Sequence, residues 1–279
     1  MLAYAIRRLC LGFGIMLFVS LVVFVLTNVA TDPGIAIAGE GATQSDIEAA
    51  RQTYGFDRPI IERYASWLGE AATGDFGTSY RQHRRVSTVV LERLPVTMIL
   101  GCLALAVALL VALPLAVLAA MRPGSVLDRL ALAIALFGQA MPTFWLALLG
   151  ILVFSVLLGW LPASGSSIPA NFVLPACTLG IFATPAILRL TRSGLIEVLR
   201  ADYIRTARAK GLRRPRVLLK HALRNAIVPV VSVASVQFGA LLGGSVVTET
   251  IFAMNGIGYL AWQAISDDDL PVIQALILI

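Results

Sequence analysis

Ionisable side chains are missing from long parts of this 279-residue chain. No Asp, Glu, Lys, Arg or His lies within residues 9–30, 94–121 or 130–188. Carboxylates and histidines inside a membrane mark proton relays and ion-coupled carriers, so their absence argues against a proton-driven carrier. Sodium sites can be built from carbonyl and hydroxyl oxygens, so a sodium-coupled carrier stays open.

Sequence motifs for catalysis and nucleotide binding are also absent. The chain contains no HExxH, no CxxC pair and no GxSxG. Its only lysines, Lys210 and Lys220, do not follow a glycine, so no GxxxxGK[ST] P-loop is available to bind ATP. We therefore predict a protein that is not an enzyme and holds no cofactor or metal, and whose energy for any active transport comes from another subunit. The three cysteines lie in or beside apolar runs and are expected to act as small hydrophobic residues: Cys10, Cys102 and Cys177.

Apolar residues are what the chain has in excess. They make up 58% of it, with 14% charged residues and a mean hydropathy of +0.84, which is the composition of a membrane protein. A helical span needs about 20 apolar residues. Five stretches qualify, namely 9–30, 95–120, 126–160, 171–190 and 227–250, and the third is long enough to tilt, bend or leave the bilayer. A sixth begins at Pro271 and reaches only Ile279, so we expect the given chain to stop inside a final span.

Basic residues are distributed unevenly between the connecting segments. If the N-terminus is cytoplasmic, the inside segments 1–8, 121–129 and 189–226 carry 15 Lys and Arg against 3 acidic residues. The outside segments 31–94 and 249–270 carry 7 against 13. This is the positive-inside pattern, so the net charge of +6 reports topology in a membrane and not nucleic-acid binding.

The segment 31–94 is the largest piece outside the spans. A capped helix is expected from Ser45 or Asp46 to Gly55, and a second one enters through Pro59. The second helix should carry an apolar stripe of Ile60, Ile61, Tyr64, Ala65 and Leu68. Such helices rest on the protein or on the membrane surface, and docking of a partner is the alternative.

Helix-breaking residues gather in the middle of the chain. The run from Gly138 to Pro142, together with Pro175 and Pro185, should kink helices and free carbonyl groups. This suits a pathway for a large polar solute better than an ion filter. Candidate pathway-lining residues are Gln139, Met141, Thr143, Phe144 and Thr248.

The densest positive patch lies in the sequence ADYIRTARAKGLRRPRVLLKHALRNAIVP, which starts at Ala201. We expect Asp202 to cap a short helix, Gly211 to take the left-handed position after it, and Pro215 to start a second helix. A ridge of small residues on the first helix is formed by Tyr203, Thr206, Ala207 and Lys210. The patch could simply fix topology and touch anionic lipid. A compact Ala- and Gly-containing tip, however, fits the groove of another protein better than a lipid surface.

Several motifs in one order resemble the permeases of binding-protein-dependent ABC importers, in the dipeptide and oligopeptide branch. They are ADYIRTARAKGL with HALRNAIVP, IRRL before the first span, YGFDRPIIERYASWLGEAATGDFGTS, ERLPVTMILG, MPTFWLALL, and ETIFAMNGIGYL with DDDLPVIQAL. The likeness covers nearly the whole chain, although Asn255 stands where this branch usually has proline.

The resemblance implies an all-α bundle of six spans in the bacterial cytoplasmic membrane. A first span with an external segment (1–94) would precede the core permease domain (95–279), whose coupling loop is 191–226. The partners would be a second, similar permease, two ATPase subunits that bind ATP and Mg, an external substrate-binding protein, and membrane lipid. The coupling helix would contact an ATPase subunit through Asp202, Tyr203, Arg205, Thr206, Ala207, Lys210, Gly211 and Leu212.

The cargo stays open at this point. Peptides or peptide-like solutes fit the resemblance, and nickel chelates, glutathione, opines or haem could use the same machinery. An autonomous secondary carrier or channel and a structural membrane protein are the remaining alternatives.

Overall fold

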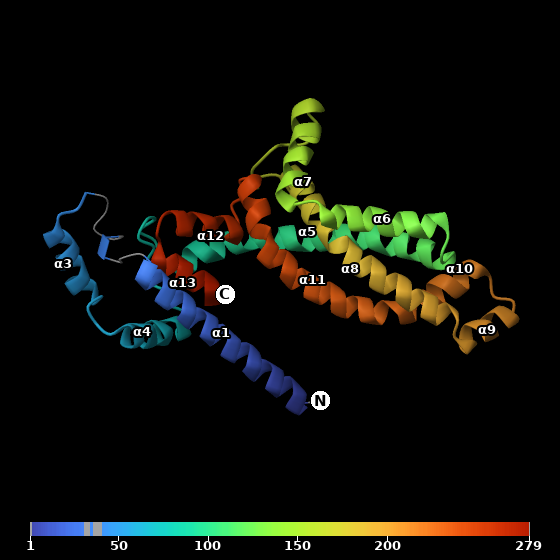
Figure 1. Cartoon of the computed structure of the whole chain (residues 1–279), viewed down its shortest axis with the longest axis horizontal. Helices are drawn as coiled ribbons and strands as arrows, with labels where there is room; N and C mark the ends of the chain where they lie inside the picture. The colour runs from blue at the N-terminus through green and yellow to red at the C-terminus, as the bar shows by residue number, and fades with distance from the viewer. Residues whose placement is uncertain (1, 31–33, 36–40, 279) are drawn as a thin grey trace. The chain divides into compact units, whose positions relative to one another are not determined.

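The chain is built almost entirely of helices (Figure 1), as the sequence predicts. The computed structural model describes residues 2–30, 34–35 and 41–278, and in this part of the chain Thr78 and Arg85 form an isolated bridge but no strand is present. The chain divides into two compact units, residues 1–94 with 260–279 and residues 95–259. Residues 260–279 thus group with the first unit and not with the segment that precedes them in sequence.

The first unit contains the apolar helix α1 (Leu2–Ala30), the short helices α3 (Gln44–Tyr54) and α4 (Ile60–Ala72), and α13 (Leu270–Leu278). The N-cap of α3 is Thr43, so the prediction of Ser45 or Asp46 is wrong by a few residues. The Thr43 hydroxyl accepts a hydrogen bond from the N–H of Asp46, whose carboxylate accepts one from the N–H of Thr43 at 3.0 Å. This reciprocal capping box satisfies two backbone donors at once. Gly55 ends α3 with φ 68°, as predicted.

The face of α4 that contacts the protein agrees only in part with the predicted stripe: Ile60, Tyr64 and Leu68 are half-buried, but Ile61 and Ala65 are exposed. Ile61 is 63% exposed, whereas Tyr64 and Trp67 pack against Phe24 of α1 with ring centroids 5.4 and 5.8 Å apart. The Tyr64 hydroxyl also lies 2.7 Å from that of Ser20. The aromatic rings decide the orientation because they bury more apolar surface than isoleucine or alanine at these positions.

The second unit holds most of the membrane-type helices. Its elements are α5 (Val86–Met121, entering from the first unit), α6 (Val126–Ala140), α7 (Thr143–Gly150), the π-helical η1 (Ile151–Leu157), the 3₁₀ turn η2 (Pro169–Phe172), α8 (Val173–Leu199), α9 (Asp202–Ala209), α10 (Arg214–Arg216), the π-helical η3 (Val217–Ala222), α11 (Leu223–Ile251) and α12 (Ile257–Ser266, continuing into the first unit).

Four helices among the described residues are long and apolar enough to cross a membrane: residues 3–29, 86–121, 169–199 and 217–251. A fifth span is possible if α6 and the α7–η1 helix count as one, although the two parts are bent by 97°. Figure 1 shows α7 turning away from the line of α6 at this break. Of the outcomes predicted for the third apolar stretch, the bend is therefore confirmed, at residues 141–142.

The two prolines expected to kink the next helix do not interrupt it. Pro175 lies in the first turn of α8, where a missing N–H removes no helical hydrogen bond. Pro185 lies inside α8, which continues through it to Leu199.

Alanine at every fourth position organises the core of the second unit. Ala104, Ala108, Ala112 and Ala116 of α5 have no exposed surface, and they share one face of the helix. A Cβ added to Gly180 of α8 would lie 2.7 Å from the carbonyl oxygen of Ala104. Small residues therefore let α5 and α8 approach until side chain meets backbone, which is how helices associate where no hydrophobic effect drives them together.

Candidate functional site

Helix α9 occupies the middle of the basic patch. Ala201 is its N-cap and Asp202 its first residue, so the predicted capping role of Asp202 is wrong. The Asp202 carboxylate instead accepts a hydrogen bond from Arg205 at 3.1 Å, one helical turn further on. Gly211 follows the helix with φ 76°, the left-handed conformation predicted for it, and the N–H of Leu212 returns to the carbonyl of Ala207 at 3.3 Å.

The two faces of α9 have different environments. Ile204 and Ala207 are 0% and 8% exposed and pack with Leu195 of α8 and with Ala222 and Ala226 of the helix that follows. The predicted ridge is thus divided, because Ala207 faces the protein's own core. The predicted coupling residues that are exposed are Tyr203, Arg205, Thr206 and Lys210, with Asp202 and Gly211 at the two ends of the helix.

The helix predicted to start at Pro215 begins at Arg214, with Pro215 in its first turn. It is not a separate short helix, because it runs from α10 through η3 into α11, with Pro229 inside α11. Hydrogen bonds in the π-helical η3 join residues five apart instead of four. Val217 and Ala222, which are five apart, both lie on the buried side, in the same cluster as Ile204 and Ala207 of α9. The corner after α9 is therefore attached directly to a membrane-type helix.

Two polar contacts fix the elements around this corner. The Tyr203 hydroxyl accepts a hydrogen bond from the Asn225 side chain at 2.7 Å. Asp128, 2% exposed at the start of α6, forms a bidentate pair with Arg192 of α8, with N–O distances of 2.5 and 2.6 Å, and also accepts the N–H of Gly124 at 2.8 Å. A bidentate pair specifies orientation as well as proximity, so it holds α6 and α8 in one arrangement.

The predicted pathway residues fall into two environments. Gln139 and Phe144 are exposed and Met141 and Thr143 half-buried, and these four surround the break between α6 and α7. Thr248 has no exposed surface, and its hydroxyl has no hydrogen-bond partner among the described residues. The structure thus brings four of the five candidates together and places the fifth inside the core.

A buried carboxylate near the end of α11 was not singled out by the sequence reasoning. Glu249 is 0% exposed. Its Oε1 accepts hydrogen bonds from the hydroxyls of Thr97 at 2.7 Å and Ser245 at 2.9 Å, and its Oε2 accepts the N–H of Tyr259 at 2.9 Å. The Thr97 hydroxyl in turn accepts the N–H of Ile257 at 2.8 Å. One side chain therefore joins α5, α11 and the start of α12.

Two glycines make room for this carboxylate. A Cβ on Gly256 would lie 2.6 Å from the Thr97 hydroxyl, and one on Gly258 would lie 2.6 Å from the Cα of Val246. The signal in the sequence was a glutamate directly at the end of an apolar run, followed by the tripeptide Gly256-Ile257-Gly258. Glu249 was placed in the outside segment 249–270 from the sequence, so the burial of this carboxylate was not predicted.

Comparison with known proteins gives the family. The family described as "Binding-protein-dependent transport system inner membrane component" matches residues 112–279, and its N-terminal companion matches residues 1–101. A putative peptide transport system permease protein of Brucella abortus (strain 2308) is 40% identical over 288 residues, covering 100% of this chain and 91% of the relative. The glutathione transport system permease protein GsiC of Escherichia coli (strain K12) is 39% identical over 280 residues, covering 100% of this chain and 92% of the relative. Among solved structures, the MetNI methionine ABC transporter in an inward-facing conformation matches with a TM-score of 0.56 at 22% identity, over 68% of this chain and 87% of the other, which shows a shared fold.

Proposed function

Because the chain belongs to the family of binding-protein-dependent transport system inner membrane components, we propose that it is the permease subunit of an ATP-driven importer for di- and oligopeptides or peptide-like solutes. The single observation that carries the proposal is likeness over the entire chain to relatives named as peptide and glutathione permeases. Glutathione is itself a tripeptide, so the two names describe one chemical class of cargo. Nickel chelates, opines and haem stay as alternative cargoes of the same machinery.

The proposed topology places the N-terminus and α9 in the cytoplasm. It rests on the charge distribution, with 15 basic and 3 acidic residues in the segments on the side of α9 and 7 against 13 on the other. On this topology α3 and α4 are external, where a substrate-binding protein would deliver cargo.

Helix α9 is the proposed contact with an ATPase subunit. Its exposed face offers Tyr203, Arg205, Thr206 and Lys210, while Ile204 and Ala207 hold the opposite face on α8 and the α10–α11 helix. ATP and Mg would be bound by two partner ATPase subunits, since this chain has no P-loop. Movement of α9 would reach the spans as a rigid-body shift, because its buried face belongs to their core.

The pathway is proposed to form between this chain and a second, similar permease. The residues around the α6–α7 break, Gln139, Met141, Thr143 and Phe144, are partly or fully exposed in the single chain and are available to face such a pathway. Thr248 is a weaker candidate, since it is enclosed by its own chain.

The test of this function uses the permease co-expressed with its proposed partners, two ATPases, a second permease and a binding protein. Thr206→Glu places a charge on the exposed face of α9, and Ser193→Glu makes the same change at an exposed hydroxyl of α8 as the matched control. We expect both variants to reach the membrane at wild-type levels. Only Thr206→Glu should lower peptide-stimulated ATP hydrolysis, by tenfold or more. Ala207→Glu is unsuitable, because its carboxylate would enter the core and destabilise the fold.

Two results would contradict the proposal. One is normal peptide uptake by complexes that carry Thr206→Glu. This result would show that the exposed face of α9 is not the contact with the ATPase subunit. The other is uptake by this chain alone in liposomes without ATP, which would identify an autonomous carrier.

A further inference from the structure

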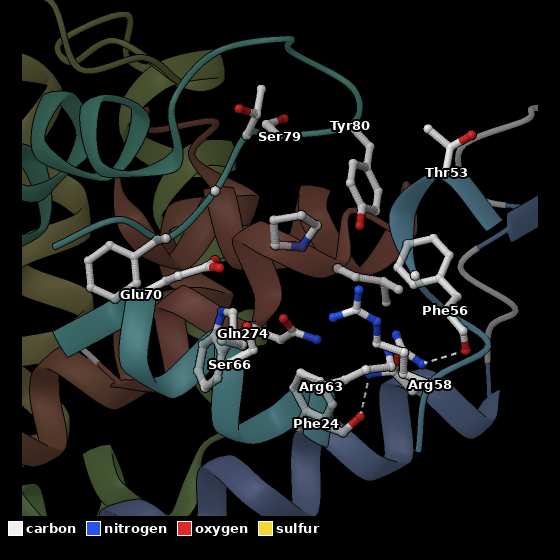
Figure 2. A pocket seen from close by; sticks show the side chains of 18 of the residues that line it. Phe24, Thr53, Phe56, Arg58, Arg63, Ser66, Glu70, Ser79, Tyr80 and Gln274 are labelled. Carbon is white, nitrogen blue, oxygen red and sulfur yellow. Dashed lines mark hydrogen bonds between the residues drawn. The ribbon is translucent and has the colours of Figure 1, made fainter. Parts of the chain in front are cut away.

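A cavity of about 660 Å³ lies within the first unit, a volume typical of small-molecule sites (Figure 2). Its walls come from the end of α1, the turn between α3 and α4, one face of α4, the loop 76–83 and the start of α13. Nothing in the proposed coupling or pathway uses this cavity.

The loop that forms one wall is held in place by a buried carboxylate. Asp269, 3% exposed, accepts hydrogen bonds from the hydroxyl of Ser79 and from the N–H of Tyr80 at 3.1 Å. Arg81 adds a hydrogen bond from its Nε to the carbonyl of Asp267 at 2.9 Å. These contacts fix Tyr80 at the cavity, so the wall is formed before any ligand arrives.

Arg63 of α4 is a charged side chain that lines the cavity. Its guanidinium lies 4.8 Å from the ring centroid of Phe56 and 5.9 Å from that of Phe24, and it donates to the side-chain oxygen of Asn28 and, at 3.5 Å, to the carbonyl of Phe56. Burial lowers the pKa of Arg63 from its ordinary value, and the neighbouring Tyr80 partly offsets this effect.

Arg63 has no carboxylate within ion-pair distance among the described residues. Aromatic faces and neutral oxygens stabilise a guanidinium without neutralising it, and a partly desolvated cation gains most from an anion. The indole N–H of Trp67, which also lines the cavity, is buried and has no acceptor in the described part of the chain. The site thus offers an unneutralised positive charge to a ligand that carries a carboxylate.

The opposite charge lies two turns further along the same helix. Glu70 is exposed to the cavity, and Figure 2 shows it on the other side of Ser66 and Gln274 from Phe56 and Arg58. Seven residues of α-helix rise about 10 Å. An extended chain spans at most about 3.3–3.6 Å per residue, so the termini of a tripeptide are about 10 Å apart.

We propose that this cavity binds short zwitterionic peptides, with Arg63 receiving the C-terminal carboxylate and Glu70 the N-terminal ammonium. The inference rests on the proposed function, because it assigns the imported cargo a second site on the permease itself. Arg58 adds a second positive charge at the carboxylate end, and Glu62 and His83 complete the charged lining. The spacing between Arg63 and Glu70 favours tripeptides over longer chains.

The test measures binding of trialanine to the full chain in lipid nanodiscs by isothermal titration calorimetry. Trialanine amide and N-acetyl-trialanine remove one terminal charge each. We expect the dissociation constant to rise at least tenfold for either derivative, since each loses one charge-assisted contact. Equal binding of trialanine and its amide by the wild-type chain would overturn the proposal without any mutation.

Variants then assign the two ends. Arg63→Gln should bind trialanine and its amide equally weakly, and Glu70→Gln should no longer distinguish trialanine from the N-acetyl derivative. Arg63→Lys keeps the charge and should preserve the preference for a free carboxylate, which separates recognition from a folding defect. Arg51→Gln removes a positive charge from α3 outside the cavity and should behave as wild type.

A parallel measurement on the whole complex separates this inference from the proposed function. Peptide-stimulated ATP hydrolysis without trialanine binding to the permease would refute the cavity site and leave the importer intact. If Arg63→Gln weakens attachment of the substrate-binding protein but not trialanine binding, the cavity receives an acidic side chain of that protein, and the peptide site is wrong.

Discussion

Replacing Glu249 by Gln tests whether the buried carboxylate holds the C-terminal end of α11 in place. Gln keeps one carbonyl oxygen, which can still face the hydroxyls of Thr97 and Ser245. Its amide nitrogen then meets the N–H of Tyr259, donor against donor. A buried donor left unsatisfied costs about 1–3 kcal/mol, and the bonds that remain lose their charge assistance, so we expect a loss of about 2–4 kcal/mol in the free energy of unfolding.

This loss is large enough to measure by thermal unfolding. For a unit of this size, each kcal/mol lowers Tm by about 2–4 °C, which gives a decrease of about 4–16 °C. Intrinsic fluorescence of the purified chain in nanodiscs, heated at one fixed rate for all variants, reports this change. Glu197→Gln, at an exposed position of α8, is the matched control and should shift Tm little.

Thr97→Val provides the second half of the test. The Thr97 hydroxyl donates to Glu249 and accepts the N–H of Ile257, so its removal leaves a backbone donor without a partner. Because the two residues share one network, the double variant should lose less stability than the sum of the single variants. The network would be refuted if Glu249→Gln had the same Tm as the Glu197→Gln control. It would also be refuted if the stability losses of the two single variants simply added up in the double variant.

Two further predictions concern packing and pH. Gly180→Ala should destabilise the second unit by about 1–3 kcal/mol through overpacking, because the new methyl group meets the carbonyl of Ala104. Gly239→Ala has open space around it and should stabilise α11 by about 0.5–1 kcal/mol. Thermal unfolding of both variants checks this contrast. Hydrogen bonds from Thr43 hold the pKa of Asp46 below its ordinary value, so the stabilisation of α3 by this capping box is present above the ordinary pKa and is lost as the pH falls through the lowered one. Carboxyl NMR titration should show this lowered pKa, and Thr43→Val should raise it only part of the way to the ordinary range, because the backbone N–H of residue 43 still donates to the carboxylate.

Much of the helix plan could be predicted from the sequence because it depends on local chemistry. Gly55 and Gly211 were placed correctly after their helices, since only glycine adopts positive φ there without strain. The break at residues 141–142 follows from Pro142, which disfavours helical conformation in the residue before it. These features need no knowledge of distant residues.

The features that the sequence did not reveal depend mostly on contacts distant in sequence, whereas the two misplaced helix caps, at Thr43 and Ala201, are local errors of one to three residues. Ala207 was assigned to a surface ridge by its small size, but Leu195 and Ala226 bury it, and an eight-residue helix has too few turns for its pattern to reveal this. The partner of Glu249 could not be identified from its local sequence, because Thr97 lies 152 residues earlier. The cavity around Arg63 joins α4 with α13, so no single window of sequence contains it.

The alanine face of α5 has a consequence for how this protein tolerates mutation. Ala104, Ala108, Ala112 and Ala116 have no exposed surface, whereas Leu110 on the same helix is 74% exposed. Any larger side chain on the alanine face would push two backbones apart, while aliphatic exchanges at Leu110 would only alter contacts with whatever surrounds the helix. Deep mutational scanning of α5 should therefore reveal a period of four residues in fitness, in a helix whose hydrophobicity is nearly uniform around its axis.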